Sequence, residues 1–242
     1  RDHSMRIPRP GVSPSTGSPN ACTQCHEDRT DSWAYEALQQ WGVSTDFQEL
    51  SLVKARFAAD RGDVRSLPTL ESVVTDDERS SLMRASLIEQ LGNLGSRQLP
   101  SLTAMLLRAD APELRASAVR ATRSMPPAQR YLMLRPFISD PVLTIRMEVA
   151  QVLAGVPASE LRPQDIDDLK PLFEEYLAVQ ANHLDMPSVH MQLASFWLDR
   201  GDSEQALSAL EEAVYLNPQL EPAVVNLVDL LRRTGRNDDA ST

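Results

Sequence analysis

The residues of this sequence with the clearest chemical potential are two cysteines and a histidine near its beginning. Cys22, Cys25 and His26 form the pattern C-x-x-C-H, and these two cysteines are the only ones among 242 residues. The pattern is the attachment signature of a c-type haem: two thiols form thioethers with two vinyl groups, and the next imidazole reaches the iron. The sequence therefore predicts one covalent haem c, held by Cys22 and Cys25, with His26 as the proximal iron ligand.

Other kinds of cysteine site fit the same five residues less well. A thioredoxin-like redox dithiol lies at a helix start after a strand, whereas the segment before Cys22 is rich in Pro and Ser. Half of a zinc site would need two further ligands, and only His3, His183, His190 or carboxylates are available. A chance pattern is the remaining alternative.

The sixth iron ligand has several candidates among the other histidines and methionines. His3 is the preferred one, as a ligand of this haem or of a neighbouring haem, and Met5 is a weaker choice. His190 falls at a helix-packing position and His183 near a helix end, so both are expected to be structural or surface residues. Ligation by two histidines would leave no open iron position, which suits electron transfer.

Aromatic and basic side chains close to the motif are candidates for the haem surroundings. Trp33 and Trp41 are spaced by two helical turns and share one face, so they can cover a haem or simply pack against the next helix. Arg6 and Arg9 can pair with the haem propionates, because guanidinium groups match carboxylates. Solvated arginines are an equally good interpretation of these two residues.

The elements that must position the motif are an arm before it and a helix after it. Residues 1–20 contain four prolines and are expected to form an extended arm. Residues 31–42 are expected to form a helix that Asp31 or Ser32 caps and Gly42 stops. The predicted haem-binding segment is residues 1–45.

A repeated pattern fills residues 46–160. Arg84, Arg115 and Arg146 recur at a spacing of 31 residues, each followed by small and apolar positions, and residues 53–57 fit as a fourth copy. A fixed period of this size indicates stacked helix pairs, none of which buries its apolar face alone. The pattern resembles short HEAT-like repeats, in which we expect Asp110 and Asp140 to act as helix caps.

Residues 161–242 follow a different repeat pattern. Residues 188–218 match the tetratricopeptide (TPR) pattern, with a turn at Gly201 and small residues at Ala206 and Ala213 where two helices touch. Leu227, Gly235 and Ala240 follow Leu193, Gly201 and Ala206 by 34 residues. The predicted fold is therefore all-α: an α-solenoid of HEAT-like and then TPR helix pairs, preceded by an extended haem-binding arm.

Composition limits the classes of partner. The net charge of −10 argues against nucleic acid, whose phosphates require clustered Lys and Arg. No stretch approaches the roughly 20 apolar residues that span a bilayer, and the first ten residues contain no apolar signal segment. Because the chain begins at Arg1, we expect it to be a processed piece of a longer protein.

The order of these segments resembles the C-terminal part of a multihaem c-type cytochrome. The resemblance is carried by RDHSMRIPRP, by SPNACTQCHEDR with a nearby SWA, and by the order of HEAT-like and TPR repeats, and it covers nearly the whole chain. It implies attachment and proximal roles for Cys22, Cys25 and His26, and it gives His3 the place of a haem-ligating histidine. This chain departs from the pattern because it has no further C-x-x-C-H motif, so other haems would lie outside it.

The predicted function is an exported electron-transfer module in the periplasm or outside the cell. Its partners would be other haem-bearing cytochrome domains or subunits, a protein bound by the repeat surface, or further copies of the chain. The alternatives are an interaction scaffold with a mainly structural haem, or a subunit of a multihaem reductase. A reductase would need acid–base groups near an open iron position, and only Glu27, Asp28 and Asp31 are close in sequence.

Overall fold

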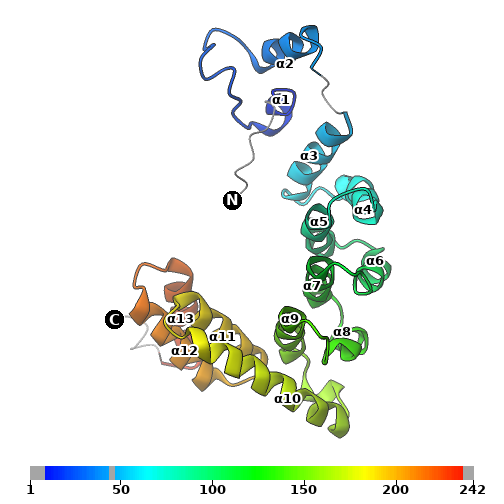
Figure 1. Ribbon diagram of the computed structural model, residues 1–242. Helices are drawn as coiled ribbons and strands as arrows, with labels where there is room; N and C mark the ends of the chain where they lie inside the picture. Colours follow the sequence, from blue (N-terminus) through cyan, green and yellow to red (C-terminus); the bar gives the residue numbers. More distant parts are fainter. Residues whose placement is uncertain (1–8, 44–46, 237–242) are drawn as a thin grey trace. The chain divides into compact units, whose positions relative to one another are not determined.

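The computed structural model describes residues 9–43 and 47–236, and within these ranges every regular element is a helix. Figure 1 shows how the helices follow one another along the chain. The chain divides into two compact units, residues 1–102 and 103–242, with the division inside helix α6 (Leu99–Leu106). The predicted all-α class is confirmed, and the repeat types remain predictions.

The segment before the cysteines is helical where an extended arm is predicted. Helix α1 (Ser13–Thr16) is one turn long, and Gly17 ends it with a φ of 69°. Pro14 is tolerated because the first turn of a helix needs no N–H donor. The side-chain hydroxyls of Ser15 and Thr16 both donate to the Val12 carbonyl at 3.0 Å.

Helix α1 packs against the two helices that follow it. It contacts helices α2 (Asp31–Gln40) and α3 (Phe47–Ala59), and Val12 and Ser13 are buried. Gly11 lies so close to the Tyr35 ring that a Cβ atom there would be 2.7 Å from it. The prediction of an extended arm is therefore wrong for residues 13–16, because local hydroxyl bonds and apolar contacts favour a turn.

The first unit continues with helices that pack in the order of the chain. Helix α3 packs against α4 (Leu67–Thr75), and α4 packs against α5 (Ser81–Asn93). The core between them is aliphatic and includes Leu70, Val74 and Leu87, which have no exposed surface.

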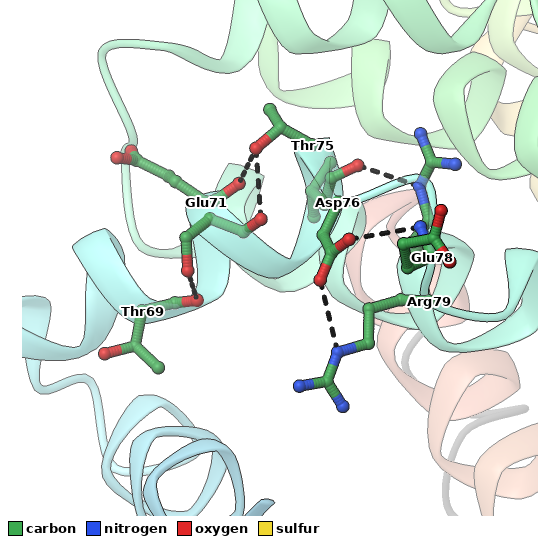
Figure 2. A network of polar contacts seen from close by, with 9 residues as sticks. Thr69, Glu71, Thr75, Asp76, Glu78 and Arg79 are labelled. Carbon is green, nitrogen blue, oxygen red and sulfur yellow. Dashed lines mark hydrogen bonds and ion pairs between the residues drawn. The ribbon is translucent and has the colours of Figure 1, made fainter. Parts of the chain in front are cut away.

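Polar side chains order the connection from α4 to α5. Figure 2 shows Thr75 donating to the carbonyls of the preceding turn and Asp76 accepting from the residues after it. The Asp76 carboxylate accepts the Glu78 N–H at 3.1 Å and the Arg79 Nε–H at 3.4 Å. A short carboxylate side chain thus replaces main-chain partners at the point where α4 ends.

The second unit contains seven further α-helices in its described part, α7 to α13. Helix α9 (Leu143–Ala154) packs against α7 (Pro112–Ala121), α8 (Pro127–Leu134) and α10 (Pro163–Gln180). Helix α11 (Pro187–Asp199) packs against α12 (Ser203–Leu216), and α12 packs against α13 (Glu221–Arg233).

The pair α11–α12 has the features expected of the predicted helix–turn–helix unit. Gly201 adopts a φ of 79° in the turn, a conformation that favours glycine. Asp202 caps α12 by accepting the Gln205 N–H at 3.0 Å. Ala206 and Ala213 have no exposed surface, so small residues do lie where the helices pack closely.

The arginines of the 31-residue pattern share a structural role. The Nε of Arg84 donates to the Val74 carbonyl at 2.9 Å, and Arg115 donates to the Ala109 and Asp110 carbonyls at the same distance. Arg146 donates to the Asp140 carbonyl at 2.7 Å. Each guanidinium therefore ties its helix to the main chain that ends the preceding helix pair.

Each of these arginines also meets an acidic partner. Arg84 pairs with Asp77 at 2.7 Å, Arg115 with Asp140 at 3.3 Å and Arg146 with Glu175 at 2.5 Å. The Arg146 guanidinium lowers the pKa of Glu175 through its hydrogen bonds. The spacing of 31 residues thus arises because each of these arginines bonds to the chain at the end of the preceding helix pair.

The predicted caps Asp110 and Asp140 are wrong as helix caps. Ala111 and Val142 occupy the N-cap positions of α7 and α9, and neither makes a side-chain cap. Asp140 instead accepts the Val142 N–H at 2.8 Å and the Arg115 guanidinium. Asp110 contributes its main-chain carbonyl to Arg115.

Candidate functional site

The cysteine motif forms a turn between α1 and α2. The His26 N–H donates to the Cys22 carbonyl at 2.9 Å, and the Cys25 N–H donates to the same carbonyl at 3.3 Å. Residues three and four apart are neighbours on one side of such a turn. The turn therefore joins Cys25 and His26 to Cys22 through two main-chain hydrogen bonds and keeps the three residues close together.

The three reactive side chains are open to a ligand. Cys22 is half-buried, Cys25 and His26 are exposed, and both thiols are free rather than paired in a disulfide. These are the properties that covalent attachment of a haem needs: two free thiols at the surface, with an imidazole beside them.

Asn20 holds this turn in place, and sequence reasoning missed it. Its side-chain oxygen accepts the N–H groups of Cys22 and Thr23 at 3.0 and 3.1 Å. Its amide group donates to the carboxylate of Asp31 and to the Ser13 hydroxyl at 3.5 Å. An asparagine two residues before a turn is the usual sequence signal for such bonds, so the run S-P-N-A-C contained this information.

Asp31 links the turn to helix α2. Its carboxylate accepts from Asn20 and, at 3.4 Å, from the Thr23 hydroxyl. The predicted cap is wrong, because Thr30 is the N-cap and its hydroxyl accepts the Trp33 N–H at 3.2 Å. Asp31 is the first helical residue, where a negative charge is favourable. The helix ends at Gln40, and Gly42 follows with a φ of 71°, as the predicted stop requires.

The two tryptophans of α2 have different surroundings. The Trp33 ring is half-buried and lies 5.0 Å from the His26 ring, centroid to centroid, while the Arg29 guanidinium lies 5.6 Å from the Trp33 ring centre. Trp41 is 74% exposed. The face that α2 buries is that of Ala34 and Leu38, so the structure brings Trp33 to the motif and leaves Trp41 at the surface.

The remaining predicted site residues divide between the surface and the undescribed part of the chain. Arg9 is exposed. His3, Met5 and Arg6 lie outside the described residues, so their predicted roles stay predictions.

The histidines of the second unit have the burial that the sequence predicts, one packed inside and one at the surface. His190 is buried with its Nε2 2.8 Å from the Leu184 carbonyl oxygen, and His183 is exposed at the end of a short 3-10 turn.

The alternative interpretations of the cysteine motif find little support. Residues 9–43 and 47–236 contain no group of three His, Cys, Asp or Glu side chains suited to a metal ion such as zinc. The motif also differs from a redox dithiol at a helix start, because α2 begins only at Asp31.

Two adjoining hollows lie along helices α9, α11 and α13 of the second unit. One, of about 200 Å³, is lined by side chains of α9 and α11 that include Gln151, Gln192 and Ser195. The other, of about 240 Å³, lies between α11 and α13 and includes Ser195, Asn226 and Arg233. Amide, hydroxyl and guanidinium groups line both hollows together with apolar side chains.

The chain was compared with protein-family models, with curated proteins and with solved structures, and it matches none of them. None of the described helices is long and apolar enough to cross a membrane. The likeness to multihaem c-type cytochromes therefore depends on the residues quoted above.

Proposed function

We propose that this chain is an electron-transfer c-type cytochrome module that carries one haem c on Cys22 and Cys25, with His26 as an iron ligand. The observation that supports the proposal is one chain turn, closed by two hydrogen bonds to the Cys22 carbonyl, that contains two free thiols and an imidazole. When bound, the haem supplies one-electron redox chemistry, and the protein tunes it through ligands, burial and nearby charge. Thioether formation takes place after export, so we place the protein in the periplasm or outside the cell.

The chain's own residues would hold the haem in defined ways. Cys22 and Cys25 fix the porphyrin to the turn, and His26 ligates the iron from the next position. Trp33 lies beside the His26 ring and would restrict its orientation. His3 remains the candidate distal ligand of this or a neighbouring haem, and Arg6 and Arg9 remain candidates for the propionates.

The helical repeats would dock the haem segment to its redox partners. Those partners would be other haem-bearing cytochrome domains or subunits, a protein bound by the repeat surface, or copies of this chain. Stacked HEAT-like and TPR pairs present extended surfaces suited to such docking.

A second candidate function is an interaction scaffold in which the haem mainly fastens the N-terminal segment. The two hollows along α9, α11 and α13 favour this candidate. It predicts that a protein partner binds with equal affinity whether the iron is oxidised or reduced.

The test is expression of the full chain in a host that matures c-type cytochromes, followed by a pyridine haemochrome spectrum. The wild-type chain should give a c-type spectrum, and Cys22→Ser and Cys25→Ser should each lose most or all of the covalent haem. His26→Ala should change the iron spectrum, while the control His183→Ala should leave it unchanged.

The spectrum also separates electron transfer from catalysis. A low-spin iron that does not bind added carbon monoxide supports an electron carrier. A high-spin iron that binds carbon monoxide would favour a reductase and contradict the proposal.

A further inference from the structure

The polar residues beneath the cysteine turn form a connected set with one centre. Asn20 is 6% exposed, although asparagine side chains are mostly found at protein surfaces. Its oxygen accepts two main-chain N–H groups within the motif, and its nitrogen donates to Asp31 at the start of α2. The amide oxygen therefore bonds to the motif, and the amide nitrogen bonds to the helix.

The direction of these bonds is fixed by the chemistry of the two side chains. The motif offers only N–H donors to residue 20, and Asp31 offers only acceptor oxygens. Only a group with an acceptor at one end and a donor at the other satisfies both, and an asparagine amide is such a group. A carboxylate at position 20 would keep the bonds to Cys22 and Thr23 but would face a second carboxylate at Asp31.

Asp31 strengthens the same arrangement from the helix side. It accepts from Thr23 as well as from Asn20, so one carboxylate contacts two residues that flank Cys22. Hydrogen bonds to charged groups contribute more than those between neutral groups. The start of α2 and the turn are thus joined by hydrogen bonds between the protein's own side chains.

We infer that Asn20 and Asp31 are positioning residues for haem attachment: together they hold the turn from Cys22 to His26 in the conformation that receives the porphyrin. This inference rests on the proposed function. Neither residue would touch the reacting sulfur atoms. They act through the main chain of Cys22 and Thr23, and through the link between the turn and α2.

The test is a swap of the two side chains in the full chain, with haem loading measured in the maturing host. Asn20→Asp places two carboxylates together and should lower the fraction of chains that carry haem. Asp31→Asn keeps an amide oxygen that can accept from Asn20 and Thr23, so it should lower this fraction less. The double variant N20D/D31N restores a donor opposite an acceptor and should recover most of the wild-type loading.

The matched control is Asn217→Asp. Asn217 also accepts a main-chain N–H two residues on, from Gln219 at 3.1 Å, and the charge change is the same. This control should load haem like the wild-type chain. Circular dichroism of each variant checks that the helices are retained.

Amide hydrogen exchange of the haem-free chain gives an independent measurement. The Cys22 and Thr23 amides should exchange about tenfold faster in Asn20→Ala, as expected for the loss of a hydrogen bond in a buried network. Normal loading in Asn20→Asp, or no recovery in the double variant, would overturn the inference. A wild-type chain that takes up no haem would refute the proposed function, and exchange would still show whether the pair shapes the turn.

Discussion

The cysteine segment, residues 9–43, and the helix pair α11–α12 are held together by different forces. In the cysteine segment, the side chains of Asn20, Thr30 and Asp31 bond to main chain and to one another, while the cysteines and histidine stay accessible. In α11–α12, the contact is an apolar core that includes Ala194, Ala206 and Leu210.

The two kinds of contact, directed hydrogen bonds and apolar burial, suit different roles in the molecule. Apolar burial stabilises a helix pair without restricting any one side chain to a reactive geometry. Directed hydrogen bonds fix a short turn and keep its reactive groups exposed. The cysteine segment is therefore organised as a site, and α11–α12 as a support.

The largest effect should come from a cavity in the apolar core of α11–α12, and it tests whether this pair depends on apolar burial. Leu210 is 1% exposed, and Leu210→Ala should lower the free energy of unfolding of the second unit by about 2–5 kcal/mol. Chemical denaturation followed by Trp197 fluorescence, with Trp33 and Trp41 replaced by Phe, measures it. Tyr215→Ala in the same helix, at a side chain 78% exposed, is the control and should change the free energy by under about 0.5 kcal/mol. Equal losses in both variants would contradict an apolar core at Leu210.

An oversized residue at the helix contact should have the next largest effect. Ala206 has no exposed surface, so Ala206→Leu should cost about 1–3 kcal/mol through overpacking. Ser208→Leu adds a large side chain on the exposed face of α12 and serves as the control. A stabilised Ala206→Leu protein would show that the helices are not in close contact there.

In the cysteine segment, the loss of one helix cap should have a smaller and local effect. Thr30→Ala removes the acceptor for the Trp33 N–H and should destabilise α2 by about 1 kcal/mol. Ser32→Ala removes the other hydroxyl at this helix end without removing the cap. Exchange of the α2 amides distinguishes the two variants, and equal exchange would argue against Thr30 as the cap.

The smallest effect that we expect is a loss of folding stability of the second unit at low pH. Hydrogen bonds from Arg162 hold the pKa of Asp165 well below its ordinary value of 3.8. A carboxylate with a lowered folded pKa contributes stability that is present above pH 4 and is lost as the pH falls below it. Denaturation at pH 5 and pH 2.5 should show this loss, and Asp165→Asn should show less of it.

Much of the helical architecture could be predicted from the sequence, because it depends on periodicity. The helix after the motif, the α11–α12 pair and the Gly201 turn follow from apolar spacing and from turn residues. The role of the repeated arginines did not follow, since a spacing of 31 residues does not reveal that each guanidinium binds the end of the preceding pair.

The candidate site was predictable in its reactive groups and not in its support. C-x-x-C-H can be recognised in any sequence, but the contact between Asn20 and Asp31 joins a loop residue to the first residue of a helix eleven positions later. The one-turn helix α1 was missed because the prolines suggested extended chain, whereas serine and threonine hydroxyls stabilise the turn locally. Trp41 was expected to belong to an apolar face, but α2 buries Ala34 and Leu38 instead.

The central claim is that the turn from Cys22 to His26 carries a covalent haem, and peptide mass analysis of the matured chain tests it most directly. The account predicts that the peptide containing residues 22–26 is heavier by one haem and that neither cysteine reacts with an alkylating agent. A colourless protein, whose peptide has the unmodified mass and whose two cysteines are both alkylated, would contradict it.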